Sequence, residues 1–499
     1  MNSVLEYLTA AAERCPEKTA FSDGTVSLTY GQVLDQVRTV GAWVAGNVPA
    51  GSPVGVWARR TVYTPVLFLG TVLGGCFYVP LDPGLPGPKI GKILTHCAPP
   101  VILAEKEPEL PEGLAYSGSV VTLDKIVGQT QSLPCPKDGE DPQAPLYLIY
   151  TSGSTGEPKG VLKSHGSVIS FLEAYEKTFG FSTEEVIGNQ NPFCFDASAK
   201  DLYLTLYLGA RMEILDTTLF SFPVRLVEEM NRRGVTFISW VPSALSIVSQ
   251  LGTFREILPA TLRRVFFVGE VFPMKQLNRW RQALPQVQFV NLYGQSELAG
   301  ICCYYEVRGD YADTDSLPMG RPLCNSRIYL CRDGKVIREP GILGELYVAS
   351  PALALEYYRD PEKTAAAFQT LELEPGRPER VFRTGDLAQY RSDGLLVFGA
   401  RRDHQIKHMG HRIELGEIEA AAGALEDVVR CCCIYDGERS KIVLFCQLTP
   451  GSCMNNRDIL HKLKEQLAGY MVPNRVRILP EIPLNPNGKI DRPALAGRL

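Results

Sequence analysis

The chain has 499 residues, and its 51 lysines and arginines against 55 aspartates and glutamates give a formal net charge of −4. A nucleic-acid partner would require a basic face, which this balance argues against, and no apolar run approaches the roughly 18 residues of a membrane span. A chain of this length is too long for one compact core, so we expect two or three domains.

Residues 1–20 have an amphipathic pattern that includes Glu6 and Glu13, which is typical of a helix and not of a secretory signal. The 14 cysteines are scattered or adjacent, and they form no C-x-x-C pair, which argues against a zinc site. We therefore expect mostly buried thiols in a reducing cytoplasm.

Residues 26–104 alternate short apolar runs with helix-like segments. This alternation predicts parallel strands joined by crossover helices, which is an α/β fold. Residues 106–145 are rich in proline, glutamate and glycine, and they predict a loose surface connection.

The segment 151–160, TSGSTGEPKG, directly follows an apolar strand predicted at residues 146–150. Its glycines allow backbone N–H groups to approach an anion, its hydroxyls donate further hydrogen bonds, and Lys159 adds a charge. The pattern predicts a phosphate-binding loop. It is not a Walker A loop, which needs glycine before the lysine and serine or threonine after it. The alternative is a flexible turn, although flexible linkers rarely follow an apolar strand directly.

Residues 191–201, NPFCFDASAKD, place the carboxylate of Asp196 between Phe195 and Ala197. Asp196 is either the N-cap of a following helix or a ligand for a positive charge inside an apolar pocket. The sequence leaves both interpretations open.

Two further predicted strands end in polar turns, at residues 263–270 (RRVFFVGE) and 288–297 (QFVNLYGQSE). Ligands of open α/β sheets bind at the carboxyl ends of the strands, where both turns fall. The turn at 382–386, FRTGD, is either an ordinary hairpin or a ligand site. Lys489 lies in the Pro/Gly-rich segment 483–493 with no apolar periodicity around it, which by itself is typical of a surface lysine.

His404, His408 and His411 have the i, i+4, i+7 spacing of a metal-binding helix. Gly410 would interrupt such a helix, so we expect no metal there.

The segment TSGSTGEPKG resembles the signature loop of the adenylate-forming enzymes, and the turns YGQSE and FRTGD and the tail NGKIDRP resemble further motifs of that superfamily. Together with LGGCFYVPLDP and LAGYMVP, they resemble the amino-acid adenylation domains of nonribosomal peptide synthetases, with some likeness to D-alanine:carrier-protein ligases. The resemblance implies a large N-terminal core of α/β subdomains with mostly parallel sheets at residues 1–402. It also implies a small, mobile C-terminal α+β lid at residues 403–499.

The resemblance also implies an ATP site with Mg²⁺. Lys489 would be the catalytic lysine, Glu297 and Thr155 would hold the metal, and Asp403 would be the hinge. Gly410 and Arg412 would belong to the loop that turns toward the site for thioester formation. The residues implied in ATP and AMP binding are Thr151, Ser152, Gly153, Ser154, Thr155, Lys159, Gly269, Glu270, Asn291, Leu292, Tyr293, Gly294, Ser296, Asp386, Phe398, Arg401 and Lys489.

In similar amino-acid activators the aspartate at the position of Asp196 holds the substrate α-ammonium, and Phe195 resembles the aromatic gate beside the pantetheine tunnel. The residues implied in substrate binding are Asp196, Phe195, Ala197, Lys200, Ser239, Phe266, Val268, Leu292, Gly300 and Ile301. An inward-facing Lys200 would favour an acidic substrate, and an outward one a neutral or aromatic substrate. The chain departs from the family pattern at Gln295, where proline is usual, and at Val268 and Ala400, which replace glycines.

The resemblance implies ATP-dependent activation of an amino acid as aminoacyl-AMP, then transfer to the phosphopantetheine thiol of a carrier protein. We expect a monomer with no nucleic-acid or membrane partner. An acyl- or aryl-CoA ligase of the same superfamily is the alternative enzyme, and a non-catalytic nucleotide-binding scaffold is the alternative of another class. The amino acid and its chirality stay open.

Overall fold

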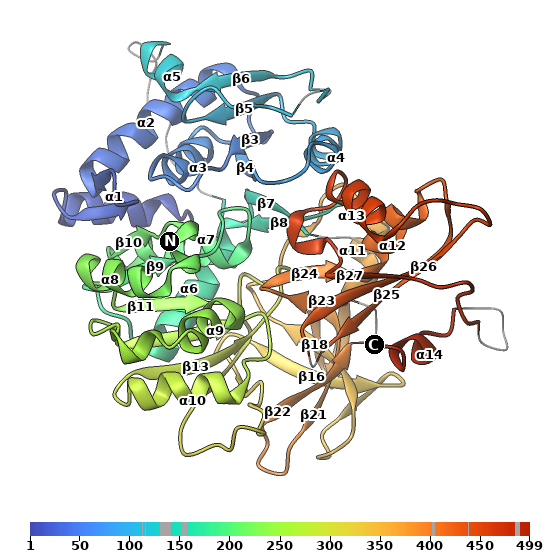
Figure 1. Ribbon diagram of the computed structural model, residues 1–499. Helices are drawn as coiled ribbons and strands as arrows, with labels where there is room; N and C mark the ends of the chain where they lie inside the picture. The colour runs from blue at the N-terminus through green and yellow to red at the C-terminus, as the bar shows by residue number, and fades with distance from the viewer. Residues whose placement is uncertain are drawn as a thin grey trace.

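Figure 1 shows the computed structural model, which describes residues 1–111, 113, 114, 116–129, 141–151, 157–401, 405–437, 439–484 and 490–499. Some predicted site residues lie outside these ranges, namely Ser152, Gly153, Ser154, Thr155, Asp403 and Lys489.

The first sheet carries the strand that precedes the predicted phosphate loop. Its strand order is β19-β8-β7-β4-β3-β5-β6, and β6, β5, β3, β4 and β7 run parallel. Strands β3, β4 and β5 are buried along their whole length, as expected of parallel strands covered on both faces. The strands are β3 (Pro53–Trp57), β4 (Phe77–Leu81), β5 (Val101–Ala104), β6 (Ser119–Thr122), β7 (Pro145–Thr151), β8 (Lys159–Ser164) and β19 (Glu356–Tyr357). Helix α2 (Tyr30–Asn47) precedes β3, and the helices between the strands are α3 (Tyr63–Leu73), α4 (Gly87–Cys97) and α5 (Leu123–Gln129).

The prediction of a loose connection over residues 106–145 was wrong in part. Strand β6 and helix α5 form within it, and β6 extends the parallel sheet beside β5. The apolar run of β6 is short and lies between glycine- and proline-rich stretches, so its pairing with β5 had no clear local signal.

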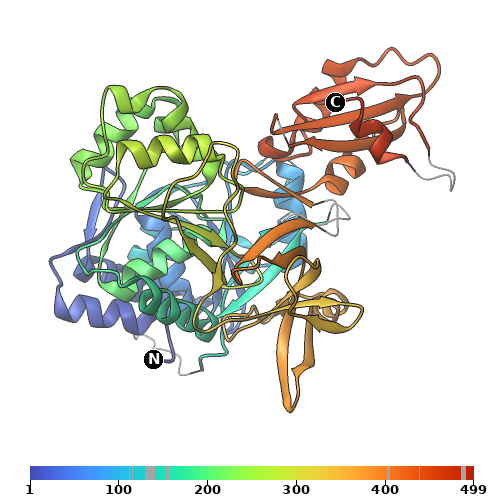
Figure 2. The ribbon, with the colours of Figure 1, turned by 90° about the horizontal axis from the view of Figure 1, so that it is seen from below.

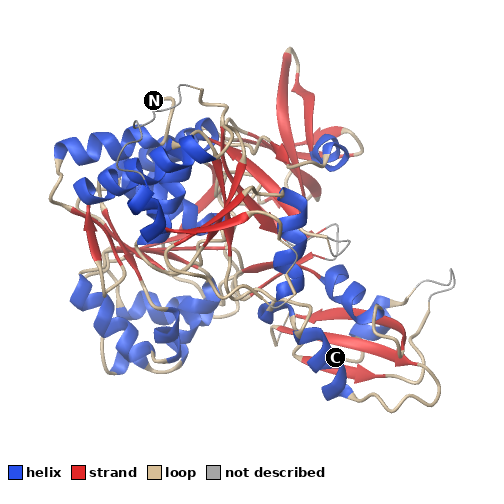
Figure 3. Cartoon of the chain, turned by 90° about the horizontal axis from the view of Figure 1, so that it is seen from above, coloured by secondary structure: helices blue, strands red, loops and turns tan. Residues whose placement is uncertain are grey.

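The second sheet has the order β15-β14-β13-β12-β11-β9-β10-β1-β2, with β13, β12, β11, β9, β10 and β1 parallel. Helices flank both sheets (Figure 3). The strands are β1 (Thr19–Ser22), β2 (Ser27–Thr29), β9 (Val186–Asn189), β10 (Arg211–Ile214), β11 (Phe237–Trp240), β12 (Arg264–Val268), β13 (Gln288–Tyr293), β14 (Cys303–Glu306) and β15 (Arg321–Pro322). The helices are α1 (Leu5–Arg14), α6 (His165–Phe179), α7 (Asp196–Leu208), α8 (Pro223–Arg233), α9 (Pro242–Gln250), α10 (Met274–Ala283), η1 (Thr217–Ser221) and η2 (Thr253–Arg255).

A third, antiparallel sheet completes the core, in the order β17-β16-β18-β21-β20 with β22 paired to β21. The pairing of β21 with β22 sets Asp386 opposite Arg401, and both face the site described below. The elements are β16 (Arg327–Arg332), β17 (Lys335–Ile337), β18 (Gly344–Ala349), α11 (Pro361–Ala367), β20 (Phe368–Glu374), β21 (Arg377–Tyr390) and β22 (Leu396–Arg401).

The C-terminal part forms a separate α+β unit, which we call the lid (residues 405–499). A hairpin, β23–β24, leads into a sheet of order β25-β26-β27, and the lid has its own core that includes Ile418, Leu444 and Ile459. Its elements are β23 (Gln405–His408), β24 (His411–Glu414), α12 (Leu415–Gly423), β25 (Val428–Asp436), β26 (Lys441–Leu448), α13 (Asn456–Lys464), η3 (Gly469–Met471), β27 (Arg475–Ile478) and α14 (Arg492–Ala496). The predicted fold class is thereby confirmed. The boundary at residue 402, and the mobility of the lid, stay predictions.

The lid lies to one side of the core, and its hairpin β23–β24 turns back toward the core (Figure 2). Gly410, at the tip of the hairpin, has a φ of +79°, and an added Cβ would lie 2.5 Å from Cγ1 of Val241 in the core. Its N–H donates to Glu270 Oε1 (2.8 Å). Farther out, Lys89 of α4 pairs with Glu417 of α12 (2.8 Å). The core and the lid are therefore in specific contact.

Within the described ranges, no helix is both long and apolar enough to cross a membrane. The cysteines that the structure describes are free thiols. His408 and His411 lie in the hairpin β23–β24 and not on a helix, with Gly410 in the turn between the strands, while His404 lies outside the described residues. No group of three or more histidines, cysteines and carboxylates in the described part of the chain is placed to hold a metal.

Candidate active site

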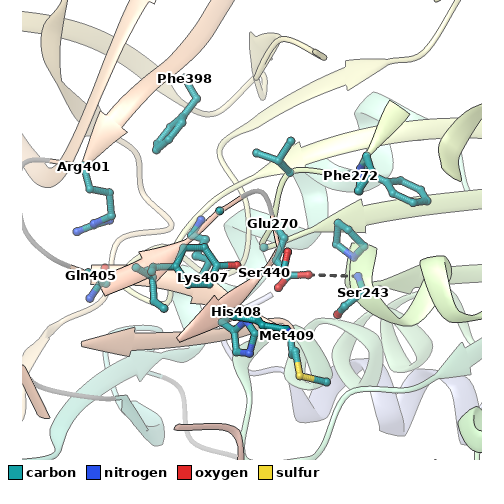
Figure 4. Close-up of a pocket in the computed structure, with 18 of the residues that line it drawn as sticks. Ser243, Glu270, Phe272, Phe398, Arg401, Gln405, Lys407, His408, Met409 and Ser440 are labelled. Atoms are coloured by element: carbon teal, nitrogen blue, oxygen red, sulfur yellow. Dashed lines mark hydrogen bonds between the residues drawn. The ribbon is translucent and has the colours of Figure 1, made fainter. Parts of the chain in front are cut away.

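A larger and a smaller cavity adjoin at the carboxyl ends of β12 and β13, where the hairpin of the lid meets the core. Their volumes are about 1210 Å³ and about 190 Å³. The wall residues they share are Gly269, Arg401, Gln405, Lys407 and Met409. In the view of Figure 4, Phe398 and Arg401 lie on one side of the larger cavity, with Lys407 and His408 of β23 between them and Glu270. The cavities occupy the place expected for ligands of an open α/β sheet.

Most of the predicted nucleotide residues gather around these cavities. Those that line the larger one are Gly269, Glu270, Asn291, Leu292, Tyr293, Asp386, Phe398 and Arg401. Thr151, Gly294 and Ser296 line the smaller one. Gly294 has no room for a side chain, because a Cβ would lie 2.1 Å from the carbonyl oxygen of Gly300. Their roles in nucleotide binding stay predictions.

The carboxylate of Asp386 is held from several sides. Tyr293 donates its hydroxyl hydrogen to Oδ2, Gln295 Nε2 donates to the same oxygen (2.8 Å), and Arg401 donates to Oδ1 (2.6 Å). Thr384 Oγ1 accepts from the backbone N–H of Asp386 (3.0 Å). Gln295 thus has a structural role at a position where the family usually has proline. These three side chains fix the orientation of the carboxylate.

Glu297 is fully buried, and its neighbours are cationic. Lys159 (2.8 Å) and the hydroxyl of Tyr357 (2.8 Å) donate to Oε1, while Arg412 of the lid donates to Oε1 (3.0 Å) and Oε2 (2.8 Å). Burial alone would raise the pKa of Glu297, but the charges of Arg412 and Lys159 hold it well below its usual value. Burial and the charge of Arg412 lower the pKa of Lys159. The predicted loop lysine and the predicted lid arginine therefore converge on one carboxylate.

This arrangement decides whether Mg²⁺ fits at Glu297. A carboxylate is a ligand that Mg²⁺ prefers. Here, however, both oxygens of Glu297 accept hydrogen bonds from Arg412, and Oε1 accepts from Lys159 as well. With the lid in this position the residues do not fit a metal ion, so the metal role of Glu297 stays a prediction that requires Arg412 to withdraw.

Asp196 lies in the wall of the smaller cavity and is not a helix cap. The cap residue of α7 is Phe195, whose side chain makes no capping bond, and Asp196 is the first helical residue. Tyr147 donates its hydroxyl hydrogen to Oδ1 (2.7 Å), and no lysine or arginine of the described ranges lies within ion-pair distance. Burial raises the pKa of Asp196, although the charge of Lys163 partly opposes this. As far as the structure is described, the pocket thus holds a partly buried carboxylate that has no cation in ion-pair contact, although the charge of Lys163 acts on it from farther away.

The predicted substrate residues divide into three groups. Those that line the smaller cavity are Phe195, Asp196, Ala197, Lys200, Val268, Gly300 and Ile301. Leu292 lines the larger cavity instead. Ser239 and Phe266 are fully buried and line neither cavity. Their roles in substrate binding stay predictions.

An aromatic cluster joins the lid to the smaller cavity. The ring of His411 stacks on Tyr470 of η3, with 3.7 Å between centroids, and meets Phe195 edge-on at 4.9 Å. Burial, with the nearby His408 and Lys89, lowers the pKa of His411 to about 4. The ring of His411 is therefore neutral at physiological pH.

Sequence reasoning missed Tyr147, Lys163, Tyr357 and Lys407. Lys163 follows an apolar run, and its Nζ is buried with no hydrogen-bond partner in the described part of the chain. Burial lowers its pKa to about 8. A lysine within a buried strand was a signal that the sequence offered. No such signal pointed to Tyr147, Tyr357 or Lys407. The ammonium of Lys407 lies 5.3 Å from the ring centroid of Tyr293.

The comparisons with known proteins agree with this geometry. A model of the AMP-binding enzyme family matches residues 8–358. The chain belongs to this family. A second model, of the C-terminal domain of AMP-binding enzymes, matches residues 417–489. The resemblance to adenylate-forming enzymes predicted from the motifs is confirmed.

The relatives of this AMP-binding enzyme differ greatly in size. One of the proteins that make up mycosubtilin synthase in Bacillus subtilis is 31% identical over 97% of this chain, but the chain spans 19% of that relative's length. The D-alanine–D-alanyl carrier protein ligase of Bacillus cytotoxicus is 29% identical, with 99% of this chain and 98% of the relative covered. The crystal structure of IdnL1 has 26% identity and a TM-score of 0.82, with 97% of this chain and 99% of that chain covered.

Proposed function

We propose that this enzyme activates an amino acid with ATP as aminoacyl-AMP, releases pyrophosphate, and transfers the aminoacyl group to the phosphopantetheine thiol of a carrier protein. One observation carries the proposal. The partly buried carboxylate of Asp196 lines a small cavity that adjoins a larger one walled by Tyr293, Asp386 and Arg401. An α-ammonium group would supply the direct ion-pair contact that no described residue makes with Asp196.

The chemistry of the first step requires positive charge at the junction of the two cavities. A carboxylate and a triphosphate repel each other by several kcal/mol at an intermediate dielectric, about 4 kcal/mol at 4 Å. Preorganised cations remove this repulsion, and no general base is needed because the nucleophile is already ionised. Lys159 lines neither cavity and is paired with Glu297, which lies between Gly294 and Gly300 of the smaller cavity's wall in the sequence. We assign Lys159 to the phosphates in the lid arrangement used for activation. We assign the corresponding role at the reacting carboxylate to Lys489.

The second step requires a thiol to reach the aminoacyl group. The contacts of Gly410 with Glu270 and of Arg412 with Glu297 support a lid arrangement in which the hairpin β23–β24 faces the site. In this proposal the lid takes a different position for activation, which comes first, and then turns to the position seen here for transfer. The two half-reactions would thus use two positions of the lid. Binding of Mg²⁺ at Glu297 belongs to the activation arrangement in this proposal. We also propose that the enzyme is a monomer.

The test is amino-acid-dependent exchange of pyrophosphate into ATP, over a panel of D- and L-amino acids. We expect exchange with one or a few amino acids, and loss of nearly all of it in Asp196→Ala. An acyl- or aryl-CoA ligase would exchange with organic acids that lack the amine and would tolerate Asp196→Ala. Absence of exchange with every amino acid, by folded protein, would refute the proposal.

A further inference from the structure

The charge of Lys200, in the wall of the smaller cavity, is already matched within the protein. Its Nζ lies 2.5 Å from Oδ1 of Asp201, and the two side chains are 2% and 0% exposed. The ammonium also lies 5.9 Å from the ring centroid of Phe237. Consecutive residues of a helix do not normally face each other, so the long side chain of Lys200 has to bend back to make this contact.

Asp201 is itself held by a chain of buried polar groups. Asn189, at the end of β9, donates from Nδ2 to Oδ2 of Asp201 (3.0 Å). Arg60 in turn donates to the side-chain oxygen of Asn189 (3.2 Å) and to the backbone carbonyls of Asn189 (2.9 Å) and Asn191 (2.7 Å). Both carboxylate oxygens of Asp201 therefore have partners, and its position is fixed from behind the cavity wall.

We propose that Asp201 sets the charge preference of the amino-acid pocket. By neutralising Lys200, it makes the pocket select substrates whose side chains carry no charge. This inference rests on the proposed function, because it concerns the side chain of the activated amino acid. It assigns a specificity role to a residue that does not line the cavity. Lys200 does not extend outward to solvent, but its pairing with Asp201 favours the neutral substrate that the sequence linked to an outward-facing lysine.

The physical reason is a count of charges in a buried site. An acidic side chain entering the pocket would have to share the single ammonium of Lys200 with Asp201. The next positive charge, that of Arg60, reaches Asp201 only through Asn189, so one of the two carboxylates would be buried without a cation in direct contact, which is costly in a protein interior. A neutral side chain avoids this conflict, so the pocket rejects the acid rather than merely failing to attract it.

The experiment measures kcat/KM for pyrophosphate exchange with the isosteric pairs aspartate and asparagine, and glutamate and glutamine. For the wild-type enzyme we expect each amide to be favoured over its acid by about tenfold or more. In Asp201→Asn, Lys200 is released, and the acid-to-amide ratio should rise by about tenfold or more. In the control Lys200→Met/Asp201→Asn, that rise should disappear, because it requires the ammonium.

Preference of the wild-type enzyme for either acid would overturn the inference while leaving the proposed function standing. An unchanged ratio in folded Asp201→Asn, or a rise that persists without Lys200, would also overturn it. If Asp201→Asn does not fold, the wild-type comparison of acids with amides decides alone. If folded wild-type protein shows no exchange with any amino acid, the proposed function fails, and the inference fails with it.

Discussion

The ion pair between Lys89 and Glu417 should hold the lid in the arrangement described above. The two side chains are 10% and 9% exposed, with 2.8 Å between Nζ and Oε1, and Lys89 also contacts Sδ of Met471 (3.4 Å). Oε2 of Glu417 is buried and has no partner among the described residues. A half-satisfied pair of this kind is compatible with a contact that forms and breaks as the lid turns.

The substitution Lys89→Met leaves the carboxylate of Glu417 buried and unpaired in the lid position described here, but not in a position in which the lid has moved away. Removal of one partner from a buried ion pair costs about 3–5 kcal/mol. The unpartnered Oε2 makes the pair weaker than a complete one, so we expect a shift of about 1–3 kcal/mol, or roughly 5- to 150-fold, against this lid position. If transfer needs this position, the transfer rate should fall by about tenfold or more, while pyrophosphate exchange changes by less than about twofold.

The assay compares exchange with single-turnover loading of a carrier protein. The matched control is Lys92→Met, on the same helix, since Lys92 is exposed and its pair with Glu157 (3.0 Å) lies at the surface. Such surface pairs contribute about 0–1 kcal/mol, so both half-reactions should stay near those of the wild type. Equal loss of both half-reactions in Lys89→Met, or no loss of transfer, would refute the reasoning.

The remaining predictions concern single side chains. Because burial raises the pKa of Asp196, the ligand-free protein loses stability as pH rises from 3.8 through that raised pKa. Asp196→Asn should therefore be more stable than the wild type at pH 8 by about 1–3 kcal/mol in urea unfolding, yet inactive in exchange; equal stability would contradict this. The pKa of His411 is lowered from 6.5 to about 4, so stability is lost as pH falls from 6.5 toward 4, by on the order of 3 kcal/mol. For His411→Phe, unfolding curves at pH 7 and pH 5 should not show the part of this decrease in stability that falls between those two pH values. If the variant loses as much stability as the wild type, His411 is not the group responsible. Gln295→Met removes a donor from Asp386, which should raise the KM for ATP by about tenfold and change the KM for the amino acid little; the reverse pattern would exclude a nucleotide role.

The sequence allowed much of the core to be predicted, because its strands are apolar runs that end in polar turns. Strands β12 and β13 and the turns after them followed from local composition alone. Strand β6 was missed because its apolar run is too short to predict a strand, and it is stabilised by its pairing with β5. The pattern of apolar runs thus predicts parallel strands well where the runs are long, and poorly where they are short.

The contacts within the site were much harder to predict. Lys89 and Glu417 are 328 positions apart, and no local pattern links them. The contact of Arg412 with Glu297 likewise depends on where the lid lies, which composition does not determine. Lys200 and Asp201 are neighbours in the sequence, so their pairing could have been predicted. That both side chains are almost fully buried is known only from the structure.

The central claim is that Asp196 binds the α-ammonium of an amino acid beside an AMP site. The most direct test is a crystal structure with a non-hydrolysable aminoacyl-sulfamoyl adenosine made from the amino acid that gives the strongest exchange. We expect the ammonium to lie within hydrogen-bond distance of Asp196 and the adenosine to lie in the larger cavity, with its ribose hydroxyls at Asp386. An analogue bound with its amine facing away from Asp196, or outside both cavities, would contradict it.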